Sequence, residues 1–157
     1  MRITLLTHST ELSKPSNTGA LVLNLAADYS VDCERVIWQR KVPDERLLQW
    51  IEHYSSGLLY PHEHAQPLSR DALPEHLVLI DSTWQQARKI RNQSAYLKAL
   101  PHYQLPSGKA SEYTLRRNQR EGGLCTSECV SALARLAGLE GFASALDDAL
   151  AKLTKAG

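Results

Sequence analysis

Short apolar runs typical of strands alternate along the chain with longer segments in which apolar residues recur at helical spacing. The strand-like runs cover 2–7, 35–39, 57–60, 76–81 and 102–105. The run 76–81 is almost uninterrupted, as expected for a strand whose two faces are both covered by helices. This alternation predicts an α/β fold with a mostly parallel sheet and helices on both faces.

Polar residues that favour helix N-termini precede the predicted helices. Asn17 or Thr18 can cap a helix over 19–27. Pro43-Asp44 opens a second helix. The apolar residues on one side of that helix are Leu47, Leu48, Ile51 and Tyr54.

Three more helices are predicted in the second half of the chain. The Ser-Thr pair at 82–83 can cap a helix over 84–100 that contains a break. The Thr-Ser pair at 126–127 can cap another helix, which Gly138 ends. A last helix covers 142–153.

Length and cysteine content narrow the class of protein. A chain of 157 residues suits a single domain, over 1–157. No apolar run approaches the ~20 residues needed to span a bilayer, and the first residues do not fit a signal peptide. The cysteines, Cys33, Cys125 and Cys129, are odd in number and lack C-x-x-C spacing, so neither a disulfide framework nor a zinc knuckle is expected. We therefore expect a cytoplasmic protein that does not enter a membrane.

The charge is distributed unevenly. The whole chain has a net charge of +1, but the segment 88–120 carries +7 and the remainder −6. The basic residues of this segment are Arg88, Lys89, Arg91, Lys98, Lys109, Arg116, Arg117 and Arg120. A local basic surface attracts nucleic-acid phosphates even on a nearly neutral protein, although a solvated helix face with a basic loop gives the same pattern.

The chemistry is expected beyond the carboxyl ends of the strands, where the loops of a parallel sheet converge. Asp81 ends a buried strand and is followed at once by Ser82-Thr83-Trp84 at a helix N-terminus. The free N–H groups of that terminus can hold an anion or the polar edge of a cofactor. The alternative is that Asp81 is an N-cap and Trp84 a core residue.

Three further segments carry polar residues in loops. In the first, Tyr113–Arg116 precedes Gly122–Glu128, where two glycines allow close approach to a ligand and Arg116 can bind a carboxylate or phosphate bidentately. The others are His8–Glu11 with Asn17–Gly19, and residues 60–65. Two histidines in 60–65 have H-x-H spacing, but no further ligands accompany them, so no metal site is expected.

Taken in order, these segments resemble the DTW-domain family. The family pattern is H-P-x-E, N-T-[GA], L-L-Y-P-x-E, D-x-T-W, Y-x-L-R and L-S-T-x-E-A. The matching segments are His8–Glu11, Asn17–Gly19, Leu58–Glu63, Asp81–Trp84, Tyr113–Arg116 and Leu124–Cys129. The resemblance covers about 5–133. The chain departs from the pattern at Ser9, His62, Cys125 and Cys129, and we find none of the Cys-rich N-terminal zinc segment of many relatives.

The resemblance implies a branch of the SPOUT (α/β-knot) superfamily, with a C-terminal trefoil knot. It further implies transfer of the 3-amino-3-carboxypropyl group of S-adenosylmethionine to N3 of a tRNA uridine, with release of 5′-methylthioadenosine. The implied partner is tRNA, and no membrane is involved. The protein would be a monomer or a homodimer.

The resemblance also implies roles for individual residues. Asp81 is the first candidate for the general base and Glu128 the second. Either Arg116 or the N–H groups near Thr126 would bind the donor's carboxylate. Implied cofactor-binding residues are Tyr60, Pro61, Glu63, Asp81, Thr83, Trp84, Leu115, Leu124 and Thr126. Implied RNA-binding residues are His8, Asn17, Thr18, Arg88, Lys89, Arg91, Arg117 and Arg120.

Three other functions fit the same residues. Two are enzymes: a SPOUT-like RNA methyltransferase, and an aminocarboxypropyltransferase that acts on ribosomal RNA. The third is a catalytically inactive RNA-binding protein, against which the joint presence of Asp81, Trp84, Arg116 and Glu128 argues.

Overall fold

The fold is a parallel sheet between two layers of helices. The computed structural model describes residues 1–106 and 125–156. Within this part of the chain six strands form one sheet in the order β2-β1-β5-β3-β6-β4, and all five pairings are parallel. The strands are β1 (Arg2–Thr7), β2 (Asp32–Ile37), β3 (Ser56–Leu59), β4 (Gln66–Pro67), β5 (His76–Asp81) and β6 (His102–Gln104). The predicted fold class is confirmed.

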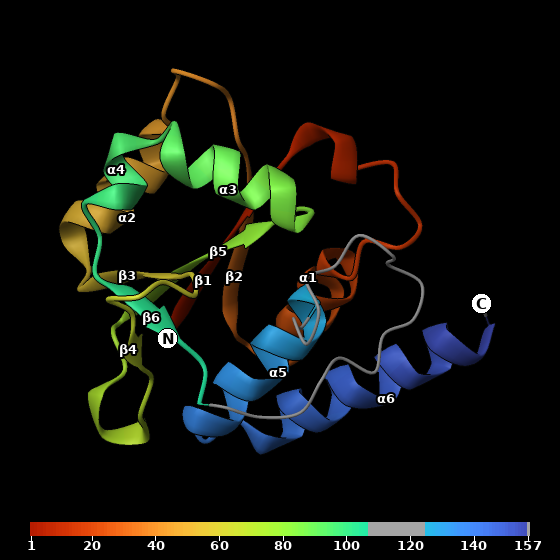
Figure 1. The fold of residues 1–157 in the computed structure, drawn as a ribbon. Coiled ribbons are helices and arrows are strands. Elements are labelled where there is room, and N and C mark those ends of the chain that lie inside the picture. The colour runs from red at the N-terminus through yellow and green to blue at the C-terminus, as the bar shows by residue number, and fades with distance from the viewer. Residues whose placement is uncertain (107–124, 157) are drawn as a thin grey trace.

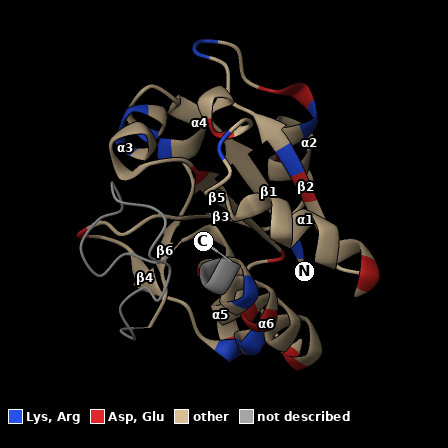
Figure 2. Ribbon diagram, turned by 90° about the vertical axis from the view of Figure 1, so that its right-hand side faces the viewer, with Lys and Arg blue, Asp and Glu red and all other residues tan. Residues whose placement is uncertain are grey.

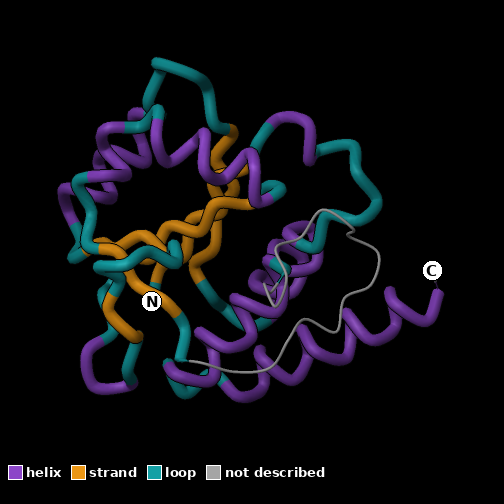
Figure 3. Tube along the Cα trace, in the orientation of Figure 1, coloured by secondary structure: helices purple, strands orange, loops and turns teal. Residues whose placement is uncertain are grey.

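Helices cover both faces of the sheet (Figures 1 and 3). On one face lie α1 (Gly19–Asp28), α5 (Thr126–Leu136) and α6 (Glu140–Ala156), and on the other α2 (Glu45–His53), α3 (Trp84–Asn92) and α4 (Ala95–Lys98). Two 3-10 turns, η1 (Ser9–Glu11) and η2 (Arg70–Ala72), lie in the connections. Each face buries its own apolar cluster, around Phe142 and Leu133 beneath α5 and α6, and around Leu47 and Ile90 beneath α2 and α3.

The central strands match the sequence prediction and the edge strands do not. The bounds of β1 and β5 are those predicted, because both strands lie inside the sheet and are almost entirely apolar. β2 begins at Asp32, three residues before the predicted start, and ends at Ile37. Among the described residues no strand lies on its outer side, so charged residues are tolerated there. β4 has only two residues, one of them Pro67, and was not predicted.

The structure confirms the predicted start of α1 and corrects that of α5. Thr18 is the N-cap residue of α1, but its side chain makes no capping bond. α5 is capped at Cys125, not at Thr126 or Ser127, and the backbone N–H of Cys125 donates to Glu128 Oε1 at 3.0 Å. Both threonine hydroxyls have partners elsewhere, at the site described below.

Other predicted helix signals are confirmed. Asp44 caps α2 by accepting from the Leu47 N–H at 2.9 Å, and Thr83 forms a capping box with Gln86 at the start of α3. The break predicted within 84–100 separates α3 from α4. Gly138, with φ of 81°, follows α5 as predicted. Leu48 was predicted on the apolar side of α2, but its side chain is largely exposed.

The segment 107–124 lies outside the described residues, and the C-terminal knot stays a prediction. In 1–106 and 125–156, no helix combines the length and the apolar character needed to cross a bilayer.

A candidate active site at the carboxyl edge of the sheet

Asp81 lies where the loops of the sheet converge. It is the last residue of β5, and it is paired in register with Thr7, the last residue of the neighbouring β1. The side chain is only 1% exposed, which is unusual for a carboxylate. A buried carboxylate needs hydrogen-bond donors around it, and this one has them.

Four side chains donate hydrogen bonds to the Asp81 carboxylate. Oδ2 accepts from the Thr7 hydroxyl at 3.1 Å and from Arg35 Nη2 at 3.4 Å. Oδ1 accepts from Asn17 Nδ2 at 2.9 Å and from the Thr126 hydroxyl at 2.8 Å. A carboxylate has about four lone-pair directions, so these donors occupy all of them. Asp81 therefore joins β1, β2, β5, α5 and the segment before α1.

A second buried carboxylate extends this network. Glu11 is fully buried and accepts from Asn17 Nδ2 at 3.1 Å and from Lys14 Nζ at 2.8 Å. The carbonyl oxygen of the Asn17 side chain in turn accepts from Arg35 Nη2 at 2.9 Å. Asn17 thus bonds to two negative side chains, Glu11 and Asp81, and to one positive side chain, Arg35. Arg35 lies in a strand and was not singled out from the sequence, although an arginine among β-forming residues was the available signal.

Gly19 allows α1 to begin against this network. A Cβ atom at this position would lie 2.6 Å from Asp81 Oδ2 and 2.9 Å from Arg35 Nη2. The close approach of the backbone explains a glycine after Asn17 and Thr18. The predicted RNA-binding residues Asn17 and Thr18 are both buried, and their bonds within the protein give them a structural task. Their contact with RNA stays a prediction.

The first turn of α5 is docked on the same edge. Thr126, its first residue, bonds to Asp81, and the backbone N–H of Ser127 donates to the Thr18 hydroxyl at 3.0 Å. Glu128 is half-buried two residues after Thr126. The structure thus brings the two predicted acids, Asp81 and Glu128, to one edge. Five predicted site residues lie outside the described residues: Leu115, Arg116, Arg117, Arg120 and Leu124.

The predicted cofactor-binding residues of β3 and α3 lie side by side. The Tyr60 ring stacks on Trp84 with centroids 5.4 Å apart and an interplanar angle of 22°. Tyr60 is 8% exposed and Trp84 half-buried, whereas Pro61 and Glu63 in the following loop are exposed. The two stacked rings form one wall of the candidate site, next to the N-terminus of α3, which Thr83 caps.

The predicted RNA-binding residues of α3 are all basic, and Figure 2 marks basic positions on this helix in blue. Arg88 and Lys89 are exposed and Arg91 is half-buried. No acid occurs in the sequence from Ser82 to Pro106. His8, by contrast, is half-buried at the end of β1 and stacks on Trp38 with centroids 6.1 Å apart.

The cysteines do not have the properties of nucleophiles or ligands. All three are free thiols, and burial raises the pKa of each to about 12. A thiol is reactive as the thiolate, so they are inert near neutral pH. Among the described residues no group of three or more His, Cys, Asp or Glu side chains is arranged to hold a metal ion.

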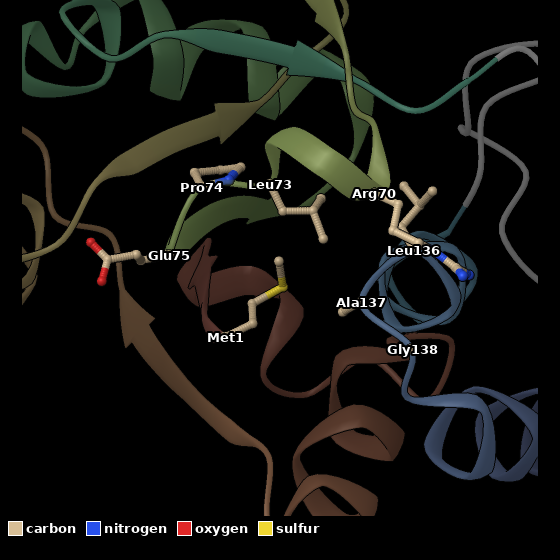
Figure 4. A pocket seen from close by; sticks show the side chains of 8 residues that line it. All are labelled: Met1, Arg70, Leu73, Pro74, Glu75, Leu136, Ala137 and Gly138. Atoms are coloured by element: carbon tan, nitrogen blue, oxygen red, sulfur yellow. The ribbon is translucent and has the colours of Figure 1, made fainter.

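A pocket of about 310 Å³ lies at the opposite, amino-terminal edge of the sheet (Figure 4). Met1 and Glu75, which precede β1 and β5, line it together with the turn from Leu136 to Gly138. The Glu75 carboxylate accepts from the backbone N–H of Ser55 at 3.0 Å. The two charged residues that line it bond elsewhere, Arg70 to the carbonyl oxygen of Arg135 and Glu75 to Ser55, so we place the candidate site at the carboxyl edge.

Comparison with known sequences identifies the family. The family model described as DTW domain matches residues 1–156. The chain belongs to the DTW domain family. A curated relative from Drosophila melanogaster, named tRNA-uridine aminocarboxypropyltransferase 2, is 33% identical over 135 residues, which are 81% of this chain and 52% of the relative. This DTW chain therefore spans about half the length of the curated relative it matches. No solved structure matches.

Proposed function

We propose that this DTW domain transfers the 3-amino-3-carboxypropyl group of S-adenosylmethionine to N3 of a uridine in tRNA and releases 5′-methylthioadenosine. The observation that carries the proposal is the similarity, over 81% of the chain, to a relative named for this class of transfer. The family match and the meeting of Asp81 and Glu128 at one edge of the sheet support it.

The edge has donors that suit the polar groups of S-adenosylmethionine. The positive end of the α5 dipole favours a carboxylate. The Ser127 hydroxyl in the first turn of this helix is buried and has no hydrogen-bond partner among the described residues, so a ligand can supply one. The Tyr60–Trp84 wall suits a flat purine ring. Arg116 remains the proposed ligand of the donor's carboxylate.

The reaction requires one proton transfer and one displacement. The uracil N3–H gives its proton to a carboxylate, and N3 then attacks the carbon of the carboxypropyl chain that is bonded to sulfur. The C–S bond breaks and its electron pair stays on sulfur, which becomes the neutral thioether of methylthioadenosine. The site selects the carboxypropyl chain over the methyl group by holding that carbon in line with N3. A uridine stacked or paired in tRNA is first flipped out.

The geometry favours Glu128 as the proton acceptor. Asp81 was the first candidate from the sequence, but its carboxylate is 1% exposed and already accepts four hydrogen bonds. Glu128 is half-buried at the N-terminus of α5 and is more accessible to a nucleobase. We assign Asp81 to holding the edge together and Glu128 to general-base catalysis, a step that contributes typically ~10²–10⁴-fold in rate.

The test uses unmodified tRNA and S-adenosylmethionine labelled separately in the carboxypropyl chain and in the methyl group. We expect only the carboxypropyl label to enter tRNA, at a uridine identified by nucleoside mass spectrometry. Incorporation of the methyl label would show a methyltransferase. Transfer to ribosomal RNA alone would show the other enzyme, and binding of S-adenosylmethionine without transfer would show an inactive RNA-binding protein.

Glu128→Gln tests the assignment of the base. Glutamine retains the capping box of α5, so the variant should fold normally while single-turnover transfer falls by about 10²-fold or more. The matched control is Glu140→Gln in the exposed first turn of α6, which should transfer at the wild-type rate. A Glu128→Gln protein that transfers as fast as this control would return the role to Asp81.

A further inference from the structure

One arginine of α3 is fixed in place by its neighbours. Arg91 Nε donates to His102 Nε2 at 3.1 Å, and Arg91 Nη1 donates to Asn92 Oδ1 at 3.2 Å. The guanidinium carbon lies 5.7 Å from the centroid of the Tyr60 ring. A surface arginine usually samples many rotamers, so three simultaneous contacts indicate a side chain that is preorganised.

The protonation pattern of His102 follows from its two bonds. Nδ1 lies 2.7 Å from the carbonyl oxygen of Leu100, which can only accept, so Nδ1 carries the hydrogen. Nε2 therefore has a lone pair and accepts from Arg91. Burial lowers the pKa of His102, and the positive charge of Arg91 lowers it further. At neutral pH His102 is thus a neutral acceptor that leaves the charge of Arg91 intact.

The contacts that Arg91 makes with described residues leave its charge without a counterion. Within the part of the chain that the structure describes, no carboxylate lies within ion-pair distance of it. Glu63 in the neighbouring loop pairs instead with His64, at 3.5 Å. Of the five N–H donors of a guanidinium, two are used by His102 and Asn92, which leaves three for a ligand.

The surroundings indicate the kind of ligand. Arg88 and Lys89 are exposed on the same helix, and Lys98 is exposed on α4. No acid separates them in the sequence, so the charged residues of α3 and α4 are all basic. One such cation is enough to neutralise a single carboxylate, whereas the sugar-phosphate backbone of a nucleic acid contacts several cations along its length.

We propose that Arg91 binds a phosphate of the tRNA backbone and that His102 is a positioning residue, which holds the Arg91 guanidinium over the Tyr60 ring. This inference rests on the proposed function, because it takes tRNA as the ligand. Because the Arg91 guanidinium is held in place before binding, the phosphate contact costs less conformational entropy.

The experiment measures the affinity for unmodified tRNA at several salt concentrations. Arg91→Ala should weaken binding roughly tenfold near 0.1 M salt and lower the slope of log K against log salt by about 1, because one phosphate contact is lost. His102→Ala should weaken binding roughly threefold with an unchanged slope, because the charge of Arg91 remains. In the Arg91→Ala background His102→Ala should have no further effect.

Two controls complete the series. Arg70→Ala removes one positive charge from η2, near the pocket at the amino-terminal edge, and should leave affinity and slope unchanged. His102→Gln retains an acceptor and a donor on one side chain and should recover most of the lost affinity. An Arg91→Ala protein with the wild-type slope overturns the phosphate contact. If His102→Ala weakens tRNA binding equally in the wild type and in the Arg91→Ala background, the positioning role is wrong.

Titration with S-adenosylmethionine by calorimetry separates this inference from the proposed function. Arg91→Ala should bind S-adenosylmethionine as the wild type does. If it loses that affinity and keeps its tRNA affinity, Arg91 is a ligand of the donor and the inference fails while the proposed transfer stands. If the wild type transfers no carboxypropyl group but the salt slopes change as expected, the proposed chemistry fails and the phosphate contact stands.

Discussion

Asp81→Asn should destabilise this protein far more than its isosteric shape suggests. The change removes the charge and converts one carboxylate oxygen into an NH₂ group, which donates. Each oxygen of Asp81 faces one hydroxyl that can rotate and one donor that cannot accept: Thr7 and Arg35 at Oδ2, Thr126 and Asn17 at Oδ1. In either orientation, therefore, the new amide meets one fixed N–H donor.

The size of the effect follows from burial. A hydrogen bond to a charged group contributes about 1.5–3 kcal/mol, and removing one partner of a buried ion pair costs about 3–5 kcal/mol. The Arg35–Asp81 pair is long, at 3.4 Å, which places Asp81→Asn at the lower end. We expect a loss of about 3 kcal/mol, which lowers Tm by roughly 6–12 °C in a domain of this size.

The assay is urea unfolding followed by circular dichroism, with Asp147→Asn as the matched control. Asp147 pairs with Arg135 at 2.6 Å, a shorter distance than in the Asp81 pair, but the two side chains are 46% and 44% exposed. Solvent screens such a pair, so its loss should cost no more than about 1 kcal/mol. Equal losses of stability in the two variants would refute the reasoning that burial, and not distance, decides the contribution.

Three further predictions concern the core. Burial, with a smaller contribution from the charge of Arg2, lowers the pKa of His76 from 6.5 to about 4, so the unfolded chain binds more protons in this interval. Stability should therefore fall as pH drops from 6.5 to 4, by on the order of 3 kcal/mol, and urea titrations of His76→Gln should show a flatter profile. A Cβ at Gly57 would lie 2.6 Å from Tyr103 Cδ2, so Gly57→Ala should lose about 1–3 kcal/mol by thermal unfolding, whereas Gly141→Ala, with its nearest atom at 3.4 Å, should lose none. The three cysteines should react with a thiol reagent at pH 8 about a hundredfold faster in denaturant than in the native protein, because burial raises their pKa values to about 12.

The sequence predicted what local patterns determine. The central strands, the break after α3 and the stop at Gly138 are confirmed, because alternation, helical spacing and capping act within a few residues. The start of β2 at Asp32 was missed because the pairing of this strand with Arg2 of β1, and not its apolar content, sets its length. β4 was missed because a strand of two residues is too short to show an alternation of apolar and polar positions.

The candidate site was predicted in place but not in its bonding. Position at the end of a buried strand was enough to find Asp81. Its four donors come from segments up to 74 residues away. Only the register of β1 against β5, and of β2 against β1, brings Thr7 and Arg35 beside it. The motif included Thr126, but no pattern in the sequence assigns its hydroxyl to Asp81 in preference to its own helix.

The attachment of α5 has a consequence for the order in which this protein matures on the ribosome. The hydrogen bonds from Ser127 to Thr18 and from Thr126 to Asp81 span 109 and 45 residues. A nascent chain that has emerged only as far as β6 already contains every strand of the described sheet, but Asp81 lacks its strongest hydroxyl donor and Thr18 its backbone partner. The edge is therefore completed only after the first turn of α5, which begins at Thr126, has emerged and docked, well after the strands themselves.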